Sequence, residues 1–379
     1  MDRRLFLAAS LGALAAPRLL AQTPPTPITR WKVTSSEGHD AIAFLGPLSG
    51  EPLYQNFYAE DARTFPLPDP IRAEIAALWK DAGSGNFGLL GPGLSSKVSG
   101  TDVSTIEGVI AALADPEARI RPSLAKTAYW DEADWKWLTA NAPRLVAVFT
   151  AMRDAGFTAF RNARTGDLAA RAAQLQRDLA PFDVIRLQER VTGRAFLPEI
   201  EVVLLQFCKP HGIKVQGQTF LQAADWNLTI TVRNAAHEML HPPVSMDGAV
   251  ARAALAVLAK DPLIPRIVRE HDPKWGYTSL DGYLNEDLVQ ALDQLISERL
   301  GVARNPADRW RDNDDGIHVL AAGLYGMLRA DTWIDNGGAI QTWLDRATRT
   351  GRLSPTNLHA VAARVLERPM NRLWPLAPR

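Results

Sequence analysis

The sequence predicts an α+β fold that is predominantly helical, with a small β-sheet in the middle of the chain and a helical C-terminal half. Apolar residues recur at helical spacing over much of its length, as in the stripe from Leu145 to Met152. Two runs, 200–207 and 213–221, have the β-branched and aromatic content typical of strands. Apolar residues make up 46% and charged residues 22%, which is ordinary globular composition.

The first half of the chain is expected to be extended at its start and helical afterwards. Residues 22–68 are rich in Pro, Thr, Gly and Ser, which predicts an extended segment with one or two strands. Glycine-rich segments at 83–85 and 91–93 are expected to break the chain. Helices are predicted over 70–80, 104–114 and 131–190, the last interrupted near Gly156 and Pro181.

The second half begins with the two strand runs, which are predicted to form a hairpin through residues 209–212. The next helix is predicted to start after Asn227, whose side chain can cap it. This helix buries an apolar stripe at helical spacing: Leu228, Val232, Ala235, Ala236, Met239 and Leu240. Further helices are predicted over 247–260, 262–270, 282–300, 316–329, 333–350 and 355–367.

The length of 379 residues permits two or three domains. We expect a signal peptide over 1–21, an extended segment with a helical N-terminal region over 22–197, and the strands with the helical C-terminal half over 198–379. Formal net charge is zero, and removing residues 1–21 takes away three arginines and one aspartate, which leaves about −2. Binding to nucleic acid or to an anionic membrane surface would need a stripe of basic residues, and the sequence shows none. Neither is therefore expected as a partner.

The N-terminus is typical of a cleaved export signal. Arg3 and Arg4 precede a short apolar stretch, 8–16, which is too short to span a bilayer. The paired arginines resemble a twin-arginine signal of bacteria, which implies export of a folded protein to the periplasm or the medium. An ordinary secretory signal is the alternative. Cleavage is expected after Ala21, with Ala16 as the other candidate, and would leave no membrane anchor.

Cys208 is the single cysteine of the chain, so an intramolecular disulfide is impossible even in an oxidising compartment. It follows the apolar run 202–207, and no neighbouring residue pattern would lower the pKa of its thiol. We therefore expect a buried, inert thiol and no nucleophile at this position.

The most informative run in the chain is His237-Glu238-Met239-Leu240-His241, which reads H-E-x-x-H. Residues four apart on a helix lie on the same face, so the two imidazoles can bind one Zn²⁺ at about 2.0–2.1 Å per nitrogen. Glu238 can reach a water that the metal activates and accept its proton. The pattern therefore predicts a zinc site with a built-in general base.

A catalytic zinc site needs a third protein ligand and an open position. The best candidate is Glu286, early in an amphipathic helix and 45 residues after His241. The competing candidates are Glu270, His271, Asp281 and Asp287. Pro242 and Pro243 follow the motif, and they predict that the helix ends at its second ligand without preventing the two rings from converging.

The order of elements resembles the gluzincin branch of zinc metallopeptidases, in particular an uncharacterised bacterial secreted branch. The elements that carry the resemblance are a strand pair, the H-E-x-x-H helix and a downstream helix with Asn285-Glu286. The resemblance covers about residues 198–300. It implies a zincin-like fold in which a small sheet packs on the active-site helix at the floor of a cleft. It also implies His237, His241 and Glu286 as zinc ligands and Glu238 as the catalytic base.

The predicted function is an exported zinc metallopeptidase that acts on a peptide or protein substrate. The developing oxyanion needs a donor, and Tyr283, Tyr325 and His318 are candidates. Asn285, Asp287 and Asp281 are candidates to orient the histidines. The alternatives are a non-catalytic periplasmic binding or scaffold protein with a structural metal or none, and a zinc hydrolase that cleaves a cell-wall amide.

Overall fold

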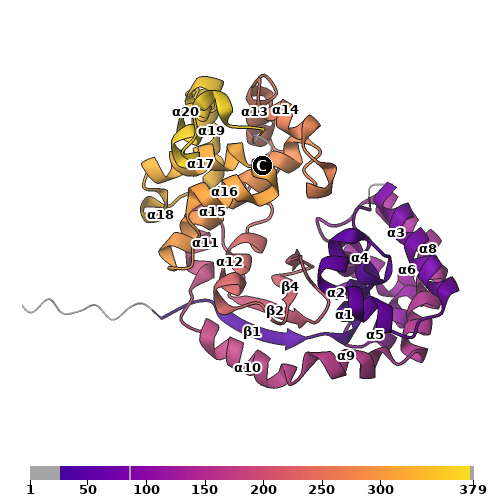
Figure 1. Cartoon of the computed structure of the whole chain (residues 1–379). Coiled ribbons are helices and arrows are strands. Elements are labelled where there is room, and N and C mark those ends of the chain that lie inside the picture. Colours follow the sequence, from indigo (N-terminus) through magenta and orange to yellow (C-terminus); the bar gives the residue numbers. More distant parts are fainter. Residues whose placement is uncertain (1–25, 85–86, 376–379) are drawn as a thin grey trace, which may run out of the picture.

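The computed structural model describes residues 26–84 and 87–375, so the predicted signal peptide lies outside the described residues. The fold is α+β and mostly helical, with one mixed four-stranded sheet, as the sequence predicts. Figure 1 shows this sheet between two groups of helices, one built from the first half of the chain and one from its end. Within the described residues, no helix combines the length and the hydrophobicity that a bilayer span requires.

The sheet has the strand order β1-β2-β4-β3, and its strands are Arg30–Ser35 (β1), Glu199–Leu205 (β2), Ile213–Lys214 (β3) and Thr219–Ala223 (β4). β1 and β4 both run parallel to the central strand β2, with Arg30 opposite Glu199 and Glu201 opposite Thr219. The sheet therefore takes one strand from before the predicted boundary at residue 198 and three from after it, and the division into domains stays a prediction.

The predicted hairpin between 200–207 and 213–221 is wrong. The second run holds two short strands, because the chain turns back at Gly217, which has φ 75°. β3 pairs antiparallel with β4, and β4 lies beside β2 in the parallel direction. A glycine inside a strand-like run was the available sign of this reversal, since positive φ is costly for other residues.

Both faces of the sheet are buried, which explains the nearly continuous apolar run of β2. Ile200, Val202 and Leu204 belong to one core, which they share with the C-terminal helices. Val203 and Leu205 belong to the other core, which they share with the helices of the first half. The sheet thus joins two hydrophobic cores and fixes the elements on either side of it.

The N-terminal lobe packs on one face of the sheet (Figure 1). Its helices are α1 Glu37–Leu48, α2 Pro52–Thr64, α3 Asp69–Ser84, α4 Leu90–Val98, α5 Ile106–Ala114, α6 Pro116–Arg119, α7 Arg121–Leu124, α8 Glu132–Asp154 and α9 Phe157–Thr165. The helices predicted over 70–80 and 104–114 are confirmed, as is the interruption at Gly156.

Two predictions for the N-terminal lobe are wrong. Residues 37–64 form α1 and α2, where an extended segment was expected. Because α1 is buried on nearly all sides, its sequence lacks the polar face that identifies a helix. Residues 91–93 also do not break the chain, since Pro92 lies in the first turn of α4, where a missing N–H removes no helical hydrogen bond.

The C-terminal lobe packs around α15, which is buried along most of its length. Its helices are α13 Ala249–Leu258, α14 Ile264–Glu270, α15 Leu280–Arg299, α16 Pro306–Asp312, α17 Val319–Ala330, α18 Trp333–Asn336, α19 Ile340–Arg349 and α20 Pro355–Leu366, with 3₁₀ turns at Pro273–Trp275, Asn313–Gly316 and Met370–Arg372. The sequence missed α16, and Gly337 with Gly338 divides the predicted helix 333–350 into α18 and α19.

The remaining helices connect the sheet to this lobe. α10 (Leu168–Leu179) lies along β1, and α11 (Val184–Thr192) packs against both α12 and α15. α12 (Leu228–Glu238) carries the motif and begins at Asn227, whose side chain accepts a hydrogen bond from the Ile230 amide, as predicted. A hydrogen bond from Gln222 Nε2 to Thr231 Oγ1 (2.8 Å) fastens α12 to β4. The motif therefore lies between the sheet and α15.

Candidate metal centre

The two motif histidines come from the last turn of α12 and from the segment that follows it. α12 ends at Glu238, so the prediction that it ends at His241 is wrong by three residues. The chain turns tightly there, with the Leu240 amide bonded to the His237 carbonyl at 3.0 Å. Pro242 and Pro243 cannot donate the amide hydrogens that further helical turns would need.

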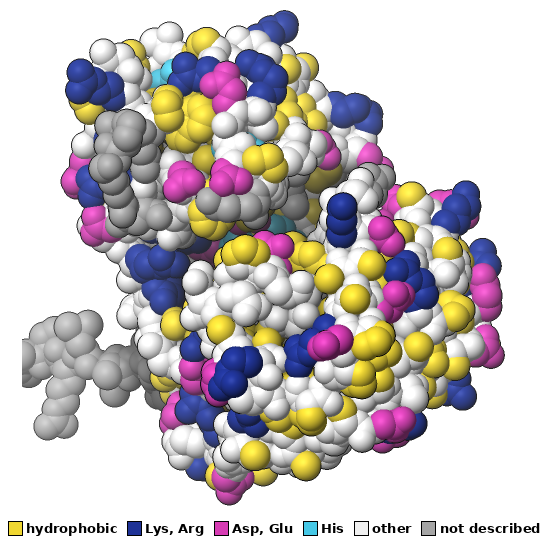
Figure 2. Space-filling view, turned by 45° about the vertical axis from the view of Figure 1, so that its right-hand side comes forward, with side chains coloured by type: hydrophobic (Ala, Val, Ile, Leu, Met, Phe, Trp, Pro, Cys, Tyr) yellow, Lys and Arg dark blue, Asp and Glu magenta, His cyan; other side chains and the backbone are white. Residues whose placement is uncertain are grey.

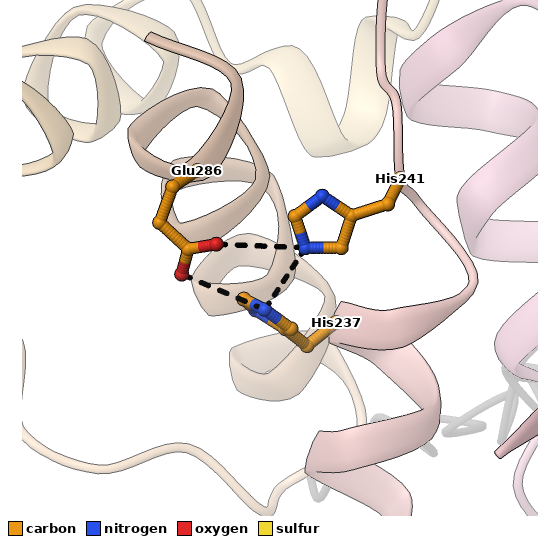
Figure 3. Close-up of side chains that lie close together, drawn as sticks. All are labelled: His237, His241 and Glu286. Carbon is orange, nitrogen blue, oxygen red and sulfur yellow. Dashed lines mark hydrogen bonds and ion pairs between the residues drawn. The ribbon is translucent and has the colours of Figure 1, made fainter. Parts of the chain in front are cut away.

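The rings of His237 and His241 nevertheless converge, and Glu286 of α15 faces them (Figure 3). The two Nε2 atoms are 3.1 Å apart. One carboxylate oxygen of Glu286 lies 3.6 Å from His237 Nε2, and the other lies 3.6 Å from His241 Nε2. Ligand atoms about 2.0–2.1 Å from a tetrahedral zinc are ~3.3–3.4 Å apart, and the three observed separations, two of which involve different oxygens of Glu286, are close to that value.

Asp293, two helical turns beyond Glu286 on α15, orients His237. Its Oδ2 lies 2.7 Å from His237 Nδ1. A carboxylate oxygen accepts hydrogen bonds only, so Nδ1 carries the hydrogen and the lone pair of Nε2 points toward Glu286 and His241. Arg309 of α16 donates to both oxygens of Asp293, which holds the carboxylate in place. Neither Asp293 nor Arg309 was predicted from the sequence to orient a histidine.

Asn285 performs the matching role at His241. Its side-chain amide lies 3.3 Å from His241 Nδ1, while its Oδ1 is buried without a partner. Rotating the amide by half a turn places Oδ1 against an Nδ1–H group and leaves Nε2 free to bind a metal. The donor set and this unpaired oxygen therefore both fit a bound cation. Of the predicted orienting residues, the structure brings Asn285 to the histidines.

The two other candidates for orienting the histidines do not reach them, and Asp281 is instead the solvated helix-start residue that was the alternative. Asp287 is buried and accepts hydrogen bonds from His318 Nδ1 (2.6 Å) and from the Ala321 amide (2.9 Å). Asp281 is an exposed residue in the first turn of α15. Glu286 itself accepts a hydrogen bond from Gln290 Nε2 at 2.9 Å, and Trp310 Nε1 donates to Gln290 Oε1 at 2.8 Å.

The competing third ligands do not reach the site. Glu270 is exposed and pairs at 3.9 Å with Arg266 on its own helix. His271 is buried, and both ring nitrogens bond to backbone carbonyls, those of Ile267 and Gly276. Among the described residues, one group of three metal-binding side chains was found, and its members are His237, His241 and Glu286.

The charges of the site are closely coupled. Burial lowers the pKa of His237, but the carboxylates of Glu286 and Asp293 outweigh it and raise the value to about 9. Burial alone would raise the pKa of Asp293, yet the Arg309 guanidinium lowers it below its ordinary value. The carboxylates around His237 therefore favour positive charge at the place where a cation would bind.

Glu238 lies beside these side chains, where the charges of His237, Glu286 and Lys214 act on it. Burial raises its pKa to about 7, and the charges of His237 and Lys214 work against that rise. A carboxylate with a pKa near neutral can accept and return a proton at the same pH. The backbone of Gly212 lies over it: a Cβ at that position would be 3.4 Å from Glu238 Oε1, so glycine leaves room above the carboxylate.

A cleft of about 560 Å³ opens beside the metal-binding side chains, and His237 lines it. Figure 2 shows the groove between the two lobes, with histidine surface on its floor next to acidic side chains. Besides His237, the cleft of about 560 Å³ is lined by Pro210, Gly212, Trp226, Ile230, Arg233, Asn234, Gln290, Asp293, Gln294, Arg304, Arg309 and Asn313. The candidate centre is therefore open on one side.

The three candidate oxyanion donors all have other partners and serve packing, the alternative that sequence reasoning favoured for each of them. Tyr283 is fully buried and donates its hydroxyl to the Ile317 carbonyl. Tyr325 donates to Glu298 (2.6 Å). His318 is fully buried, with its two nitrogens bonded to Asp287 and Asp314. Cys208 is buried as predicted, and burial raises the pKa of its thiol.

Comparisons with known proteins give no relative from which the role of the site could be inferred. No family model, no curated protein and no solved structure matches the chain. The gluzincin family that the motif suggests stays a prediction, and so do zinc and the export signal.

Replacing Asp293 with asparagine should weaken zinc binding by about 10–100-fold, because the neutral side chain no longer holds the His237 ring or balances Arg309. Competition with a fluorescent chelator measures the zinc dissociation constant. Asp308→Asn is the matched control, since it removes only a pair with Arg311 on α16. Equal zinc affinity of the two variants would show that Asp293 does not position the ligand.

Proposed function

We propose that the protein is a zinc-dependent hydrolase that cleaves amide bonds, most simply those of peptides, after export from the cell. One observation carries the proposal: His237, His241 and Glu286 converge within 3.6 Å beside an open cleft, with Glu238 next to them. The proposal includes a zincin-like arrangement, since a small sheet supports the motif helix and a second helix supplies the glutamate.

Two imidazole nitrogens and one carboxylate form a donor set typical of catalytic zinc, which keeps one position for water or substrate. Structural zinc sites instead have four protein ligands. In the part of the chain that the structure describes, three side chains form the candidate site, and His237 borders the cleft. These features favour a catalytic site over a purely structural one.

Zinc, when bound, polarises a substrate carbonyl and makes water acidic enough to lose a proton near neutral pH. Glu238 accepts that proton and then donates it to the departing amine. The pKa of about 7 that burial gives to its carboxyl suits both transfers. Asp293 and Asn285 keep the two imidazoles turned toward the reacting groups.

Tyr277 is the best donor for the negative charge that develops on the carbonyl oxygen. It lies in the loop before α15 and packs edge-on against His318, with ring centroids 5.6 Å apart. Burial and then the charges of Glu286 and Asp314 raise the pKa of its phenol, so it keeps its hydrogen. Within the described residues its hydroxyl makes no hydrogen bond, and it is therefore free to donate to a substrate.

Replacing Tyr277 with phenylalanine should lower kcat by about 10²–10³-fold with little change in zinc content, because one donor to the oxyanion is lost. Steady-state kinetics on a cleaved peptide and metal analysis measure the two effects. Tyr325→Phe is a control, since that hydroxyl donates to Glu298 Oε1. An unchanged kcat in Tyr277→Phe would exclude this role.

Metal removal tests the proposed function. The zinc-loaded protein should hydrolyse members of a random peptide library, with the products identified by mass spectrometry. Treatment with 1,10-phenanthroline should abolish the hydrolysis, and added zinc should restore it. A zinc-loaded protein that cleaves no peptide would contradict the peptidase proposal, and hydrolysis that survives complete metal removal would place the activity at another site.

A further inference from the structure

The cleft beside the candidate metal centre is rich in arginine. Arg233, Arg304 and Arg309 all line it, and they come from α12, from the loop after α15 and from α16. Elements that are distant in the sequence thus contribute cations to one wall. Arg233 and Arg309 are half-buried, and such cations normally have a carboxylate partner, whereas Arg304 is exposed.

Within the part of the chain that the structure describes, Arg309 is the one of the three that pairs with a carboxylate. Arg309 donates to both oxygens of Asp293, and Asp293 is also occupied by His237. Arg304 donates to the neutral side chain of Asn313 at 3.1 Å. Half-buried Arg233 makes no hydrogen bond or ion pair with any described residue. The guanidinium groups of Arg233 and Arg304 therefore form no direct ion pair with a described carboxylate, although Asp293 acts on both from a greater distance.

The two groups lie close enough to repel one another. Burial lowers the pKa of Arg233 first, and the charges of Arg304 and Arg309 lower it further. Burial and the charge of Arg309 likewise lower the pKa of Arg304. An anion bound between them would relieve this repulsion.

Arg233 also has a fixed relation to the reacting groups. It precedes His237 by four residues on α12, so the two side chains are neighbours on the same helix face. Their Cβ atoms are thus about 5–6 Å apart, which is within one or two residues of an extended substrate. A group bound by Arg233 would lie next to the bond that the metal centre attacks.

We propose that Arg233 and Arg304 bind a carboxylate of the substrate, so that the enzyme acts on peptides with an anionic group next to the scissile bond. The inference rests on the proposed function, because it takes the metal centre as the place of cleavage. Guanidinium groups bind carboxylates through paired hydrogen bonds of favourable geometry. The carboxylate is either the C-terminus of the peptide or an Asp or Glu side chain.

The test uses one random peptide library in two forms, with a free C-terminal acid and with a C-terminal amide. Zinc-loaded Glu238→Gln protein is incubated with each form, and the retained peptides are identified by mass spectrometry. Retention of the acid form alone assigns the site to the terminal carboxylate. Retention of both forms with Asp or Glu enriched at one position assigns it to a side chain.

The enrichment of carboxylate-bearing peptides should fall by roughly 10- to 100-fold when Arg233→Met or Arg304→Met is combined with Glu238→Gln. Arg233→Lys should keep part of it, because the charge is retained. Arg364→Met is the matched control, since Arg364 is exposed on α20. Zinc content and thermal unfolding should stay unchanged in all variants.

No enrichment of carboxylate peptides in the Glu238→Gln background would overturn the inference, as would equal enrichment after both arginines are replaced. The proposed function has a separate readout, namely cleavage of the same libraries by the wild-type protein. Peptides that are cleaved without any acidic preference would reject the carboxylate site alone. Selective retention without cleavage would reject the hydrolase and keep the binding site.

Discussion

Replacing Glu238 with glutamine is expected to lower kcat by about 10²–10⁴-fold while zinc stays bound. The substitution keeps the shape of the side chain and removes its ability to accept a proton. Glu238 lies outside the triangle formed by His237, His241 and Glu286, so the ligands are unaffected. Initial rates on a cleaved peptide and the zinc content of the same preparation measure the two parts of the prediction.

The stability of this variant serves as its control. Because burial raises the pKa of Glu238 to about 7, its folded form already tolerates the neutral state. Glutamine should therefore leave the melting temperature of the protein almost unchanged. A variant that retains more than a tenth of the wild-type kcat would rule out Glu238 as the general base.

Replacing Glu286 with glutamine is expected to weaken zinc binding by more than ~100-fold, which exceeds the effect expected for a residue that only orients a ligand. The reason is that this carboxylate supplies the one negatively charged donor of the triangle, 3.6 Å from each imidazole nitrogen. Hydrolysis should be lost in parallel. Competition with a chelator of known affinity gives the dissociation constant.

Glu298→Gln is the matched control for this variant. Glu298 lies on the same helix, and it accepts a hydrogen bond from Tyr325 away from the candidate centre. Its replacement should leave zinc affinity unchanged. If Glu286→Gln binds zinc as tightly as Glu298→Gln does, the third ligand is another residue and the assignment of Glu286 fails.

Local signals in the sequence were sufficient for most helices. Asn227 caps α12 as predicted, because an Asn side chain satisfies a free amide at a helix start without help from the rest of the fold. α1 was missed because its burial on nearly all sides removes the polar face. The parallel pairing of β2 with β4 was missed because it depends on contacts between distant segments, which no local pattern encodes.

The candidate site was predictable where the chemistry is local. His237, Glu238 and His241 form a motif, and Glu286 lies early in the helix that was predicted to supply the third ligand. Asp293 was missed, although its spacing of seven residues from Glu286 places both on one face of α15. That spacing was a usable signal.

Other functional residues could not be found from sequence. Tyr277, the proposed oxyanion donor, lies in a loop with φ 57°, a conformation that the sequence does not indicate for tyrosine. Arg233 is one of many arginines, and its lack of an acidic partner is visible only after folding. Tyr283, although near Glu286 in sequence, points into the core and bonds to the Ile317 carbonyl.

Anomalous X-ray scattering at the zinc absorption edge, from crystals of the zinc-loaded protein, tests the central claim most directly. The account predicts one strong peak at bonding distance, about 2.0–2.2 Å, from His237 Nε2, His241 Nε2 and a carboxylate oxygen of Glu286. A protein that binds no zinc after reconstitution, or a peak that lies away from these three side chains, would contradict it.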